Sequence, residues 1–334
     1  MDSTFRPDNP QRASTGPRGG SLLYPLHRRR APSRYAKGST TGRRWTRAQA
    51  TQMLALSDRE LFRQIADTET SFVISPRSPA SGHEAFIDTP VSELKATTRP
   101  VQHRGSTNRI GVELSSTEHG TRPLMTESRL EASAVRHWSW IRSTRCLAAH
   151  PVVLRFRLPD GTELTHVPDL LVEDSAGHRT LVNVKPRVFW DPVFALQCSL
   201  TNVWCEYYGL SCLVYSTPSR ARIKMQELVR NHAVTARSTR DNSDAIFRLL
   251  TQPRSCHYLA HRTRGYGQFQ PALMHLVAQH RVNIPLNSEL HSTTRVTRGE
   301  PGSQDEGFVH PTAEIVGEVL AQQGTSESSI VGAV

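Results

Sequence analysis

Three polar side chains within residues 163–187 have the types and spacing needed to bind a divalent metal ion and hydrolyse a phosphodiester bond. Asp169 lies within one short apolar stretch, and Asn183 and Lys185 lie at the end of the next. Residues two apart on a strand project from the same face, so Asn183 and Lys185 point the same way and Asp169 can face them across a hairpin. Carboxylate and amide oxygens are ligands for a hard divalent ion, and a lysine can orient water or offset phosphate charge. An ordinary surface hairpin is the alternative interpretation of this spacing.

Short strands are predicted to position these residues. Residues 164–172 and 180–184 are the two strands of the hairpin, with a turn at residues 174–178 between them. A further strand at residues 152–158 precedes them, and the turn signal Pro159-Asp-Gly161 joins it to the hairpin. Pro186 ends the last strand.

A helix is predicted before the strands, beginning near Thr126 and running to about residue 146. Glu127 and Glu131 are four apart and therefore share one helix face. Glu131 has two interpretations that the residues leave open. It forms a capping box with Ser128, because Ser-x-x-Glu is that motif, or it adds a third acidic group to the Asp169 site.

A second helix and a fourth strand are predicted after the hairpin. Residues 191–208 form the helix, with Asp191 as N-cap, Pro192 at the first helical position and Gly209 as the C-terminal stop. Gln197 on this helix is within reach of the site, although a surface or core amide is the simpler interpretation. The apolar residues 210–215 then form a strand reached by a crossover. The order predicts an α/β core: helix, three strands, helix and strand, in a mixed sheet flanked by helices.

The charge of the chain favours a polyanionic partner. The 334 residues carry a net charge of +11. Residues 1–50 contribute +9 and residues 299–334 contribute −6, which leaves +8 on the middle of the chain. The basic character is therefore not confined to a tail, which supports nucleic acid over a small-molecule substrate.

The cysteine count and the hydropathy pattern exclude several classes of protein. Five cysteines without a Cys-x-x-Cys motif argue against a disulfide framework or a zinc site and favour small buried side chains in a reducing cytoplasm. No apolar run reaches about 18 residues, so no membrane span is predicted. The first residues lack an apolar signal core, so export is not expected.

Four regions are predicted along the chain. Residues 1–108 are a basic, largely disordered arm and linker, with one helix at residues 46–67. Residues 109–217 are the α/β core. Residues 218–298 are helical with two short strands, similar to a winged-helix module, and residues 299–334 are an acidic disordered tail with a weak helix near residues 313–322.

These residues resemble a known family. Glu127-Ser-Arg-Leu-Glu131, His166-Val-Pro-Asp-Leu170 and Val182-Asn-Val-Lys-Pro186, in this order of elements, resemble the PD-(D/E)xK nuclease superfamily and its restriction-endonuclease-like fold. They are most similar to TnsA-like endonuclease subunits of heteromeric bacterial transposases. The resemblance covers residues 110–216 and implies that Glu131, Asp169 and Lys185 are catalytic. The superfamily usually has Asp or Glu where this chain has Asn183, which fits the TnsA-like branch and implies weaker Mg²⁺ binding.

The resemblance also implies partners and an activity. The expected function is a Mg²⁺-dependent endonuclease, with Mn²⁺ as a substitute, that nicks one strand at each transposon end. Glu131, Asp169 and Asn183 would hold the ion, and Lys185 would position the water. The expected partners are double-stranded DNA, an integrase-type transposase subunit and an ATPase regulator, in the cytoplasm at the bacterial nucleoid. The candidate DNA contacts are basic: Arg187, Arg220, Arg222, Lys224 and Arg230.

Two other functions stay open on the same residues. The stretch Arg145-Cys-Leu-Ala-Ala-His-Pro151 is less typical of the family, which allows a catalytically inactive DNA-binding and assembly subunit. A standalone restriction or repair nuclease is the third possibility. The inactive assembly subunit would bind no metal ion at Asp169. The standalone nuclease would cleave unrelated DNA without a partner.

Overall fold

A computed structural model gives the three-dimensional structure of the chain. It describes residues 46–331, except for positions 58–59, 62, 64–66, 76–77, 98–110, 118–119, 142, 158–162, 233–236, 264–265 and 300–307. The predicted basic arm at residues 1–45 therefore lies outside the described residues. Within the described part, none of the helices is both long enough and apolar enough to span a lipid bilayer.

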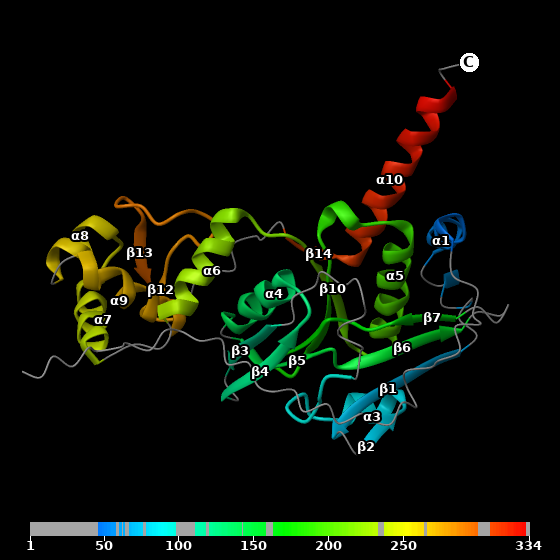
Figure 1. The fold of residues 1–334 in the computed structure, drawn as a ribbon, viewed down its shortest axis with the longest axis horizontal. Coiled ribbons are helices and arrows are strands. Elements are labelled where there is room, and N and C mark those ends of the chain that lie inside the picture. Colours follow the sequence, from blue (N-terminus) through cyan, green and yellow to red (C-terminus); the bar gives the residue numbers. More distant parts are fainter. Residues whose placement is uncertain are drawn as a thin grey trace, which may run out of the picture. The chain divides into compact units, whose positions relative to one another are not determined.

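A five-stranded mixed sheet organises the fold, in the order β14-β10-β9-β8-β5 (Figure 1). The strand bounds are β5 Thr144–Ala149, β8 Leu170–Asp174, β9 Arg179–Val184, β10 Ser211–Tyr215 and β14 Val309–Pro311. β10 runs parallel to β9, and the other neighbouring pairs are antiparallel. The predicted hairpin is present as β8 and β9, and the predicted crossover runs from β9 through α5 (Pro192–Tyr207) to β10. The α/β class is confirmed, but the predicted strand at residues 152–158 lies in a second sheet rather than in this one.

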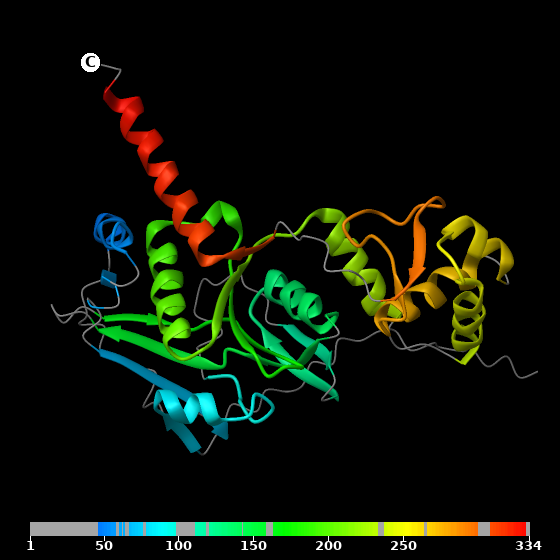
Figure 2. The same ribbon diagram turned by 180° about the vertical axis from the view of Figure 1, so that it is seen from behind.

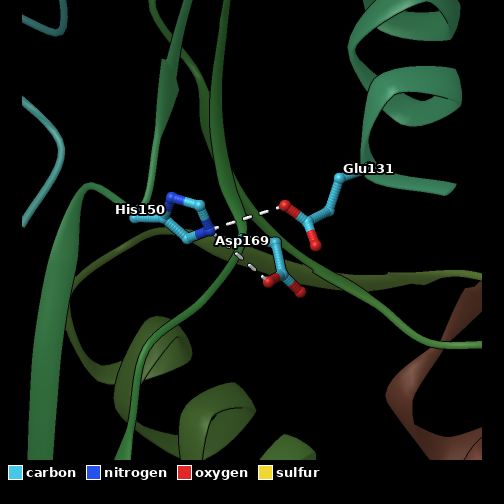
Figure 3. A group of neighbouring side chains, drawn as sticks. All are labelled: Glu131, His150 and Asp169. Carbon is cyan, nitrogen blue, oxygen red and sulfur yellow. Dashed lines mark ion pairs between the residues drawn. The ribbon is translucent and has the colours of Figure 1, made fainter. Parts of the chain in front are cut away.

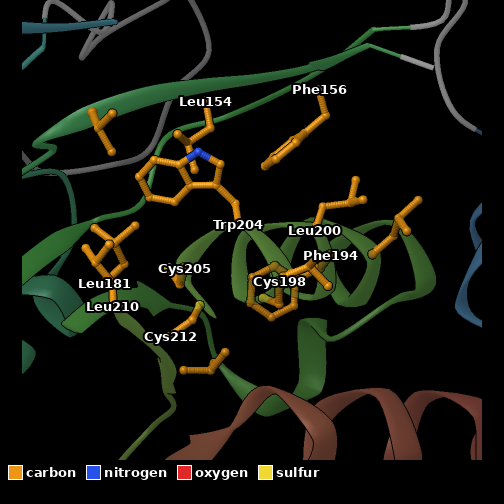
Figure 4. Close-up of a cluster of buried hydrophobic side chains, with 14 of the residues drawn as sticks. Leu154, Phe156, Leu181, Phe194, Cys198, Leu200, Trp204, Cys205, Leu210 and Cys212 are labelled. Carbon is orange, nitrogen blue, oxygen red and sulfur yellow. The ribbon is translucent and has the colours of Figure 1, made fainter. Parts of the chain in front are cut away.

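A different helix covers each face of this sheet. Leu147, Leu170 and Val182 pack with residues of α4 (Arg129–Ser139), whereas their neighbours along the strands pack with residues of α5. Side chains alternate between faces along a strand, so one sheet supplies two apolar cores. Figure 4 shows part of the core on the α5 side, which contains Leu181, Trp204 and four of the five cysteines. All five cysteines are buried and free, as predicted.

A second sheet, in the order β2-β1-β6-β7, packs against the other side of α5. Its bounds are β1 Asp67–Ser75, β2 Ser78–Ser81, β6 Val152–Arg157 and β7 Glu163–His166, and the helix α3 His83–Asp88 follows β2. The prediction that residues 68–108 are a linker is therefore wrong as far as residue 97. The prolines in this region suggest irregular structure, but Pro79 lies in β2 at the sheet edge, where a missing backbone N–H is tolerated. Phe72 and Phe86 from this region are fully buried.

Three further boundaries differ from the prediction. The predicted strand at residues 164–172 is two strands in different sheets, β7 and β8, because Pro168 between them cannot donate to a ladder. The first helix, α1 (Arg47–Leu54), is shorter than predicted. The helix α4 ends at Ser139 rather than near residue 146, and β5 follows it. The apolar run of β5 is buried on both faces, a pattern that periodicity cannot separate from a buried helix.

A β-ribbon lies before α4. Its first strand is β3 (Gly111–Thr117), which pairs antiparallel with β4 (Gly120–Thr126). Ser128 follows this ribbon and caps α4.

The region after β10 is helical, with a small sheet in the order β11-β13-β12. Its elements are α6 Arg220–His232, α7 Arg237–Leu249, β11 Arg254–Ser255, α8 Cys256–Arg262, α9 Tyr266–Ala278, β12 Val282–Asn283 and β13 Arg295–Arg298. It has an apolar core of its own. Its likeness to a winged-helix module stays a prediction.

The acidic C-terminal segment is not a disordered tail where the structure describes it. β14 pairs with β10 at the edge of the central sheet, and α10 (Thr312–Val331) packs against α5 (Figure 2). Ile315 and Val319 of α10 are buried in the α5 core. The predicted tail is therefore partly core, because the apolar face of α10 outweighs the acidic composition of the segment.

Candidate metal centre

Glu131 lies in the first turn of α4 and is held by the residues before it. The Ser128 hydroxyl accepts a hydrogen bond from the Glu131 backbone N–H at 3.1 Å and donates to Oε1 at 3.0 Å. The Glu127 N–H donates to Oε2 at 2.7 Å. The predicted N-cap is therefore present, and the same side chain also faces the candidate site. The two interpretations of Glu131 are compatible because capping occupies only part of the carboxylate.

Asp169 lies immediately before β8 and is fixed from both sides. Its Oδ2 accepts a hydrogen bond from the Val184 N–H at 2.6 Å. Its backbone N–H donates to the Val182 carbonyl at 3.1 Å, and its carbonyl accepts from the His150 N–H at 2.8 Å. The break at Pro168 thus places the carboxylate at the end of the sheet, next to the last residues of β9.

His150 completes a group that the sequence did not reveal. Its Nε2 lies 3.6 Å from Glu131 Oε2, 3.9 Å from Asp169 Oδ1 and 4.0 Å from Glu127 Oε1. Figure 3 shows the three side chains of Glu131, His150 and Asp169 pointing toward one another. Their potential ligand atoms lie within 4.8 Å of each other. We call Glu131, His150 and Asp169 the carboxylate–histidine cluster.

The backbone of His150 is in a strained conformation. Its φ is +46°, a left-handed value that non-glycine residues rarely adopt. The Thr97 N–H and hydroxyl hold its carbonyl at 2.9 and 3.0 Å. Strain of this kind costs about 1–3 kcal/mol and is concentrated at functional sites. The ring is therefore held in place by its surroundings rather than by its own preference.

Charge attraction decides the protonation of the cluster. Burial by itself lowers the pKa of His150, but Glu131, Asp169 and Glu127 outweigh it and raise the pKa above its ordinary value. Burial by itself raises the pKa of Glu131, but His150 and the hydrogen bonds from Glu127 and Ser128 outweigh it and lower the pKa. The contacts with His150 are too long for hydrogen bonds, so the pairing rests on charge. The carboxylates therefore favour the protonated, positively charged form of the buried His150 ring.

The same arrangement fits a divalent metal ion. The Nε2 of His150 is buried and has no hydrogen-bond partner among the described residues. Two carboxylates and an imidazole nitrogen around one point are a donor set for Mn²⁺, Fe²⁺ or Zn²⁺, whereas Mg²⁺ prefers oxygen ligands alone. An ion bound here would replace the positive charge of the imidazolium, and the neutral ring would serve as a ligand.

Lys185 and Asn183 both point toward α5, as the two-residue spacing predicts. The Lys185 ammonium lies 4.4 Å from the centre of the Phe194 ring. The Asn183 side chain is fully buried, and its Oδ1 binds His166 Nε2 at 2.7 Å. Its Nδ2 faces the Sγ atoms of Cys198 and Cys212 at 3.5 and 3.6 Å. Asn183 is therefore a core amide bonded to His166, which differs from its predicted place as a metal ligand.

Of the predicted DNA contacts, Arg222 is buried and structural, whereas Arg230 is exposed but paired. The Arg222 side chain is buried, and its guanidinium donates to His137 Nδ1 of α4 at 3.2 Å. The Arg230 Nε lies 3.2 Å from the carboxylate of Glu113, which is itself buried. The interpretation of Arg222 as a phosphate contact is wrong for this reason, since both arginines join α6 to the elements around α4.

The remaining basic candidates are exposed, but two of the three are paired. Lys224 forms an ion pair with Glu289. Arg187 forms two bonds with Glu318 of α10, at 2.6 and 2.8 Å. Arg220 is exposed on the first turn of α6. A nucleic acid would have to compete with Glu289 and Glu318 for two of these cations.

Of the predicted site residues, Glu131 and Asp169 lie in the carboxylate–histidine cluster, the role of Lys185 stays a prediction, and the sequence assigned no role to His150. The residue follows a short apolar run and precedes Pro151, and the left-handed turn there leaves no local signal. The only usable hint is that His150 and Pro151 end a short apolar stretch, which places the His150 side chain near the end of a strand.

No protein-family model matches the sequence, and a search of curated proteins returns no match. The functional argument therefore rests on the geometry of the carboxylate–histidine cluster and its neighbours.

Proposed function

We propose that this chain is a metal-dependent DNA endonuclease with a restriction-endonuclease-like core, acting as the nicking subunit of a heteromeric transposase. One observation carries the proposal. Glu131 from α4, His150 after β5 and Asp169 before β8 converge on one point, and Lys185 directly follows Val184, whose N–H holds Asp169. Three sheet or helix ends that meet in this way provide a metal site next to a lysine. The net charge of +11 supports a polyanionic substrate.

Each residue has a distinct role in this proposal. Glu131, Asp169 and His150 would hold the ion, which lowers the pKa of a bound water and polarises the phosphoryl oxygen. Ser128 and the Glu127 and Val184 N–H groups fix the carboxylates so that their ligand atoms stay aimed at one point. The Lys185 ammonium orients water or offsets the charge that develops on the phosphate.

The ligand set favours Mn²⁺ over Mg²⁺. The imidazole of His150 takes the third position, and the amide of Asn183 is bonded to His166. Mg²⁺ binds oxygen ligands, whereas Mn²⁺ accepts both carboxylate oxygen and imidazole nitrogen. We therefore expect nicking to be faster, and metal binding tighter, with Mn²⁺.

A strand-nicking assay tests the function. The substrate is DNA that carries the ends of the mobile element encoding this chain, incubated with Mn²⁺ or Mg²⁺, with and without the partner transposase. Asp169→Asn and Lys185→Ala should each reduce nicking by at least about a hundredfold, the usual scale for loss of a catalytic group. Asp174→Asn, at the opposite end of the same strand, is the control and should nick like wild type. Wild-type nicking by Asp169→Asn would refute the assignment.

A non-catalytic assembly subunit is a second candidate, and one observation favours it. The carboxylates raise the pKa of His150, and its protonated ring would offset part of their charge without a metal ion. This candidate predicts no Mn²⁺ binding in calorimetry, together with intact DNA and partner binding. Nicking of unrelated DNA without any partner would instead support a standalone restriction or repair nuclease.

A further inference from the structure

Two large apolar side chains are exposed in the turn that follows Lys185. Val188 is 84% exposed and Phe189 is 63% exposed, and both lie in the short 3₁₀ helix Arg187–Phe189. The turn begins two residues after Lys185. Exposing a valine and a phenylalanine side by side forgoes about 1.5–3 kcal/mol of burial for each. The fold itself does not use these side chains, which points to an external partner.

The turn that carries them is rigid. The Phe189 N–H donates to the Pro186 carbonyl at 2.9 Å, and the Trp190 indole N–H donates to the Lys185 carbonyl at 3.2 Å. Trp190 itself is buried, and Arg187 is held by two bonds to Glu318 of α10. The apolar tip, which consists of Val188 and Phe189, is therefore preorganised, so binding loses little conformational entropy in ordering it.

The position of the tip identifies the part of the substrate that it reaches. A chain spans at most about 3.5 Å per residue, so Phe189 lies within about 14 Å of Lys185 along the backbone. Successive nucleotides of one strand are about 3.4 Å apart along the duplex axis, so Phe189 lies within about four nucleotide spacings of the Lys185 backbone, which directly follows the Val184 N–H that holds Asp169. Phosphates and sugars are polar, and the faces of the bases are the apolar surface available there.

We propose that Val188 and Phe189 form a wedge that inserts into a base step of duplex DNA beside the scissile phosphate and unstacks it. Apolar side chains, phenylalanine among them, open base steps in this way, and stacking on an aromatic ring offsets the cost. Unstacking lets the backbone at the scissile phosphate bend into the cluster of Glu131, His150 and Asp169. The inference rests on the proposed endonuclease function. It adds that an unstacked base step of the DNA positions the scissile phosphate at the metal centre.

Permanganate reactivity of thymines measures unstacking without any cleavage. The experiment uses the full chain with Asp169→Asn, bound to the end DNA with its partner transposase. Thymines at one step should become several-fold more reactive, and adding Phe189→Ala with Val188→Ser should return them to the level of free DNA. Phe189→Leu should keep the effect. Tyr207→Ala removes an equally exposed ring about 20 Å further along α5 and is the control that should change nothing.

Nicking by the otherwise wild-type chain gives the second readout. Phe189→Ala should slow nicking of a matched duplex by about tenfold, and a mismatch at the reactive step should restore the rate. Equal slowing on both duplexes, unchanged thymine reactivity, or loss of transposase binding alone would overturn the wedge. If the wild type unstacks the DNA but does not nick it, the wedge stands and the nuclease proposal is refuted. If the wild type nicks the DNA without unstacking it, the nuclease proposal stands and the wedge is refuted.

Discussion

Replacing His150 with asparagine should destabilise the metal-free protein by about 3 kcal/mol at pH 6. Asparagine tolerates a left-handed backbone, so the change removes the ring and its charge without adding strain at φ +46°. The lost charge lies 3.6–4.0 Å from oxygens of Glu131, Asp169 and Glu127. A pair at 4 Å is worth about 4 kcal/mol at an effective dielectric constant of 20, and burial of the ring opposes part of this. Breaking a buried pair typically costs about 3–5 kcal/mol, which agrees.

The pH dependence of this loss follows from the direction of each pKa shift. The pKa of His150 is raised, so its contribution is complete below about pH 6.5 and disappears as pH rises through the folded-state value. The pKa of Glu131 is lowered, so its contribution is present above about pH 4.5 and disappears as pH falls through the folded-state value. The wild type should therefore be most stable between these two pH limits. The stability of His150→Asn should not fall as the pH rises through the folded-state pKa of His150.

Urea unfolding followed by tryptophan fluorescence from pH 5 to 9, with a chelator present, measures both effects. Saturating Mn²⁺ should stabilise the wild type more than His150→Asn at neutral pH, because the variant lacks one of the three proposed ligands and the gain in stability grows with metal affinity. Thr97→Val, which removes only the hydroxyl bonded to the His150 carbonyl, is the control for local damage and should leave the pH profile in place. A stability difference that is the same at every pH would refute the charge argument.

Three other outcomes follow from the structure. Asn183→Ala should lower stability by about 2 kcal/mol but leave Mn²⁺ affinity unchanged in calorimetry, because the amide binds His166 rather than facing the cluster; a large loss of affinity would make it a ligand after all. A chain ending at residue 307 should lose cooperative unfolding in circular dichroism, whereas one ending at residue 323 should melt like the full chain, since β14 and the buried half of α10 lie between these ends; equal melting would contradict the core role of the segment. The thiols of Cys198 and Cys205 should resist a thiol reagent at pH 8 until denaturant is added, because burial raises their pKa; rapid native-state reaction would refute this.

Local signals in the sequence predicted the parts of the fold that are locally determined. Asp191 followed by Pro192 begins α5, and Gly209, with φ +71°, lies just beyond its end. The turn at residues 174–178 is held by the Asp174 carboxylate, which accepts two backbone N–H groups. Each of these features depends on residues within five positions of one another. For the same reason Ser128 predicted the start of α4 correctly.

The errors concern interactions between distant residues. β14 joins β10 from about ninety positions away, and the short run of β14 has no periodicity that could predict a partner. His150 meets Glu131 and Asp169 only after α4, β5 and β8 are packed, and its left-handed backbone is imposed by contacts with Thr97 and Asp169. The core location of Asn183 depends on His166 in another sheet. Spacing along the chain contains none of this information.

The pairing of β14 with β10 has a consequence for biosynthesis. β10 ends at Tyr215 and β14 begins at Val309, so the edge of the central sheet stays open until about ninety further residues have left the ribosome. At about 5–20 residues per second this delay is on the order of 5–20 s. During that time the nascent chain presents β10 as an unpaired edge strand, which is a template for aggregation. The central sheet therefore cannot be completed before residues 309–311 have been synthesised.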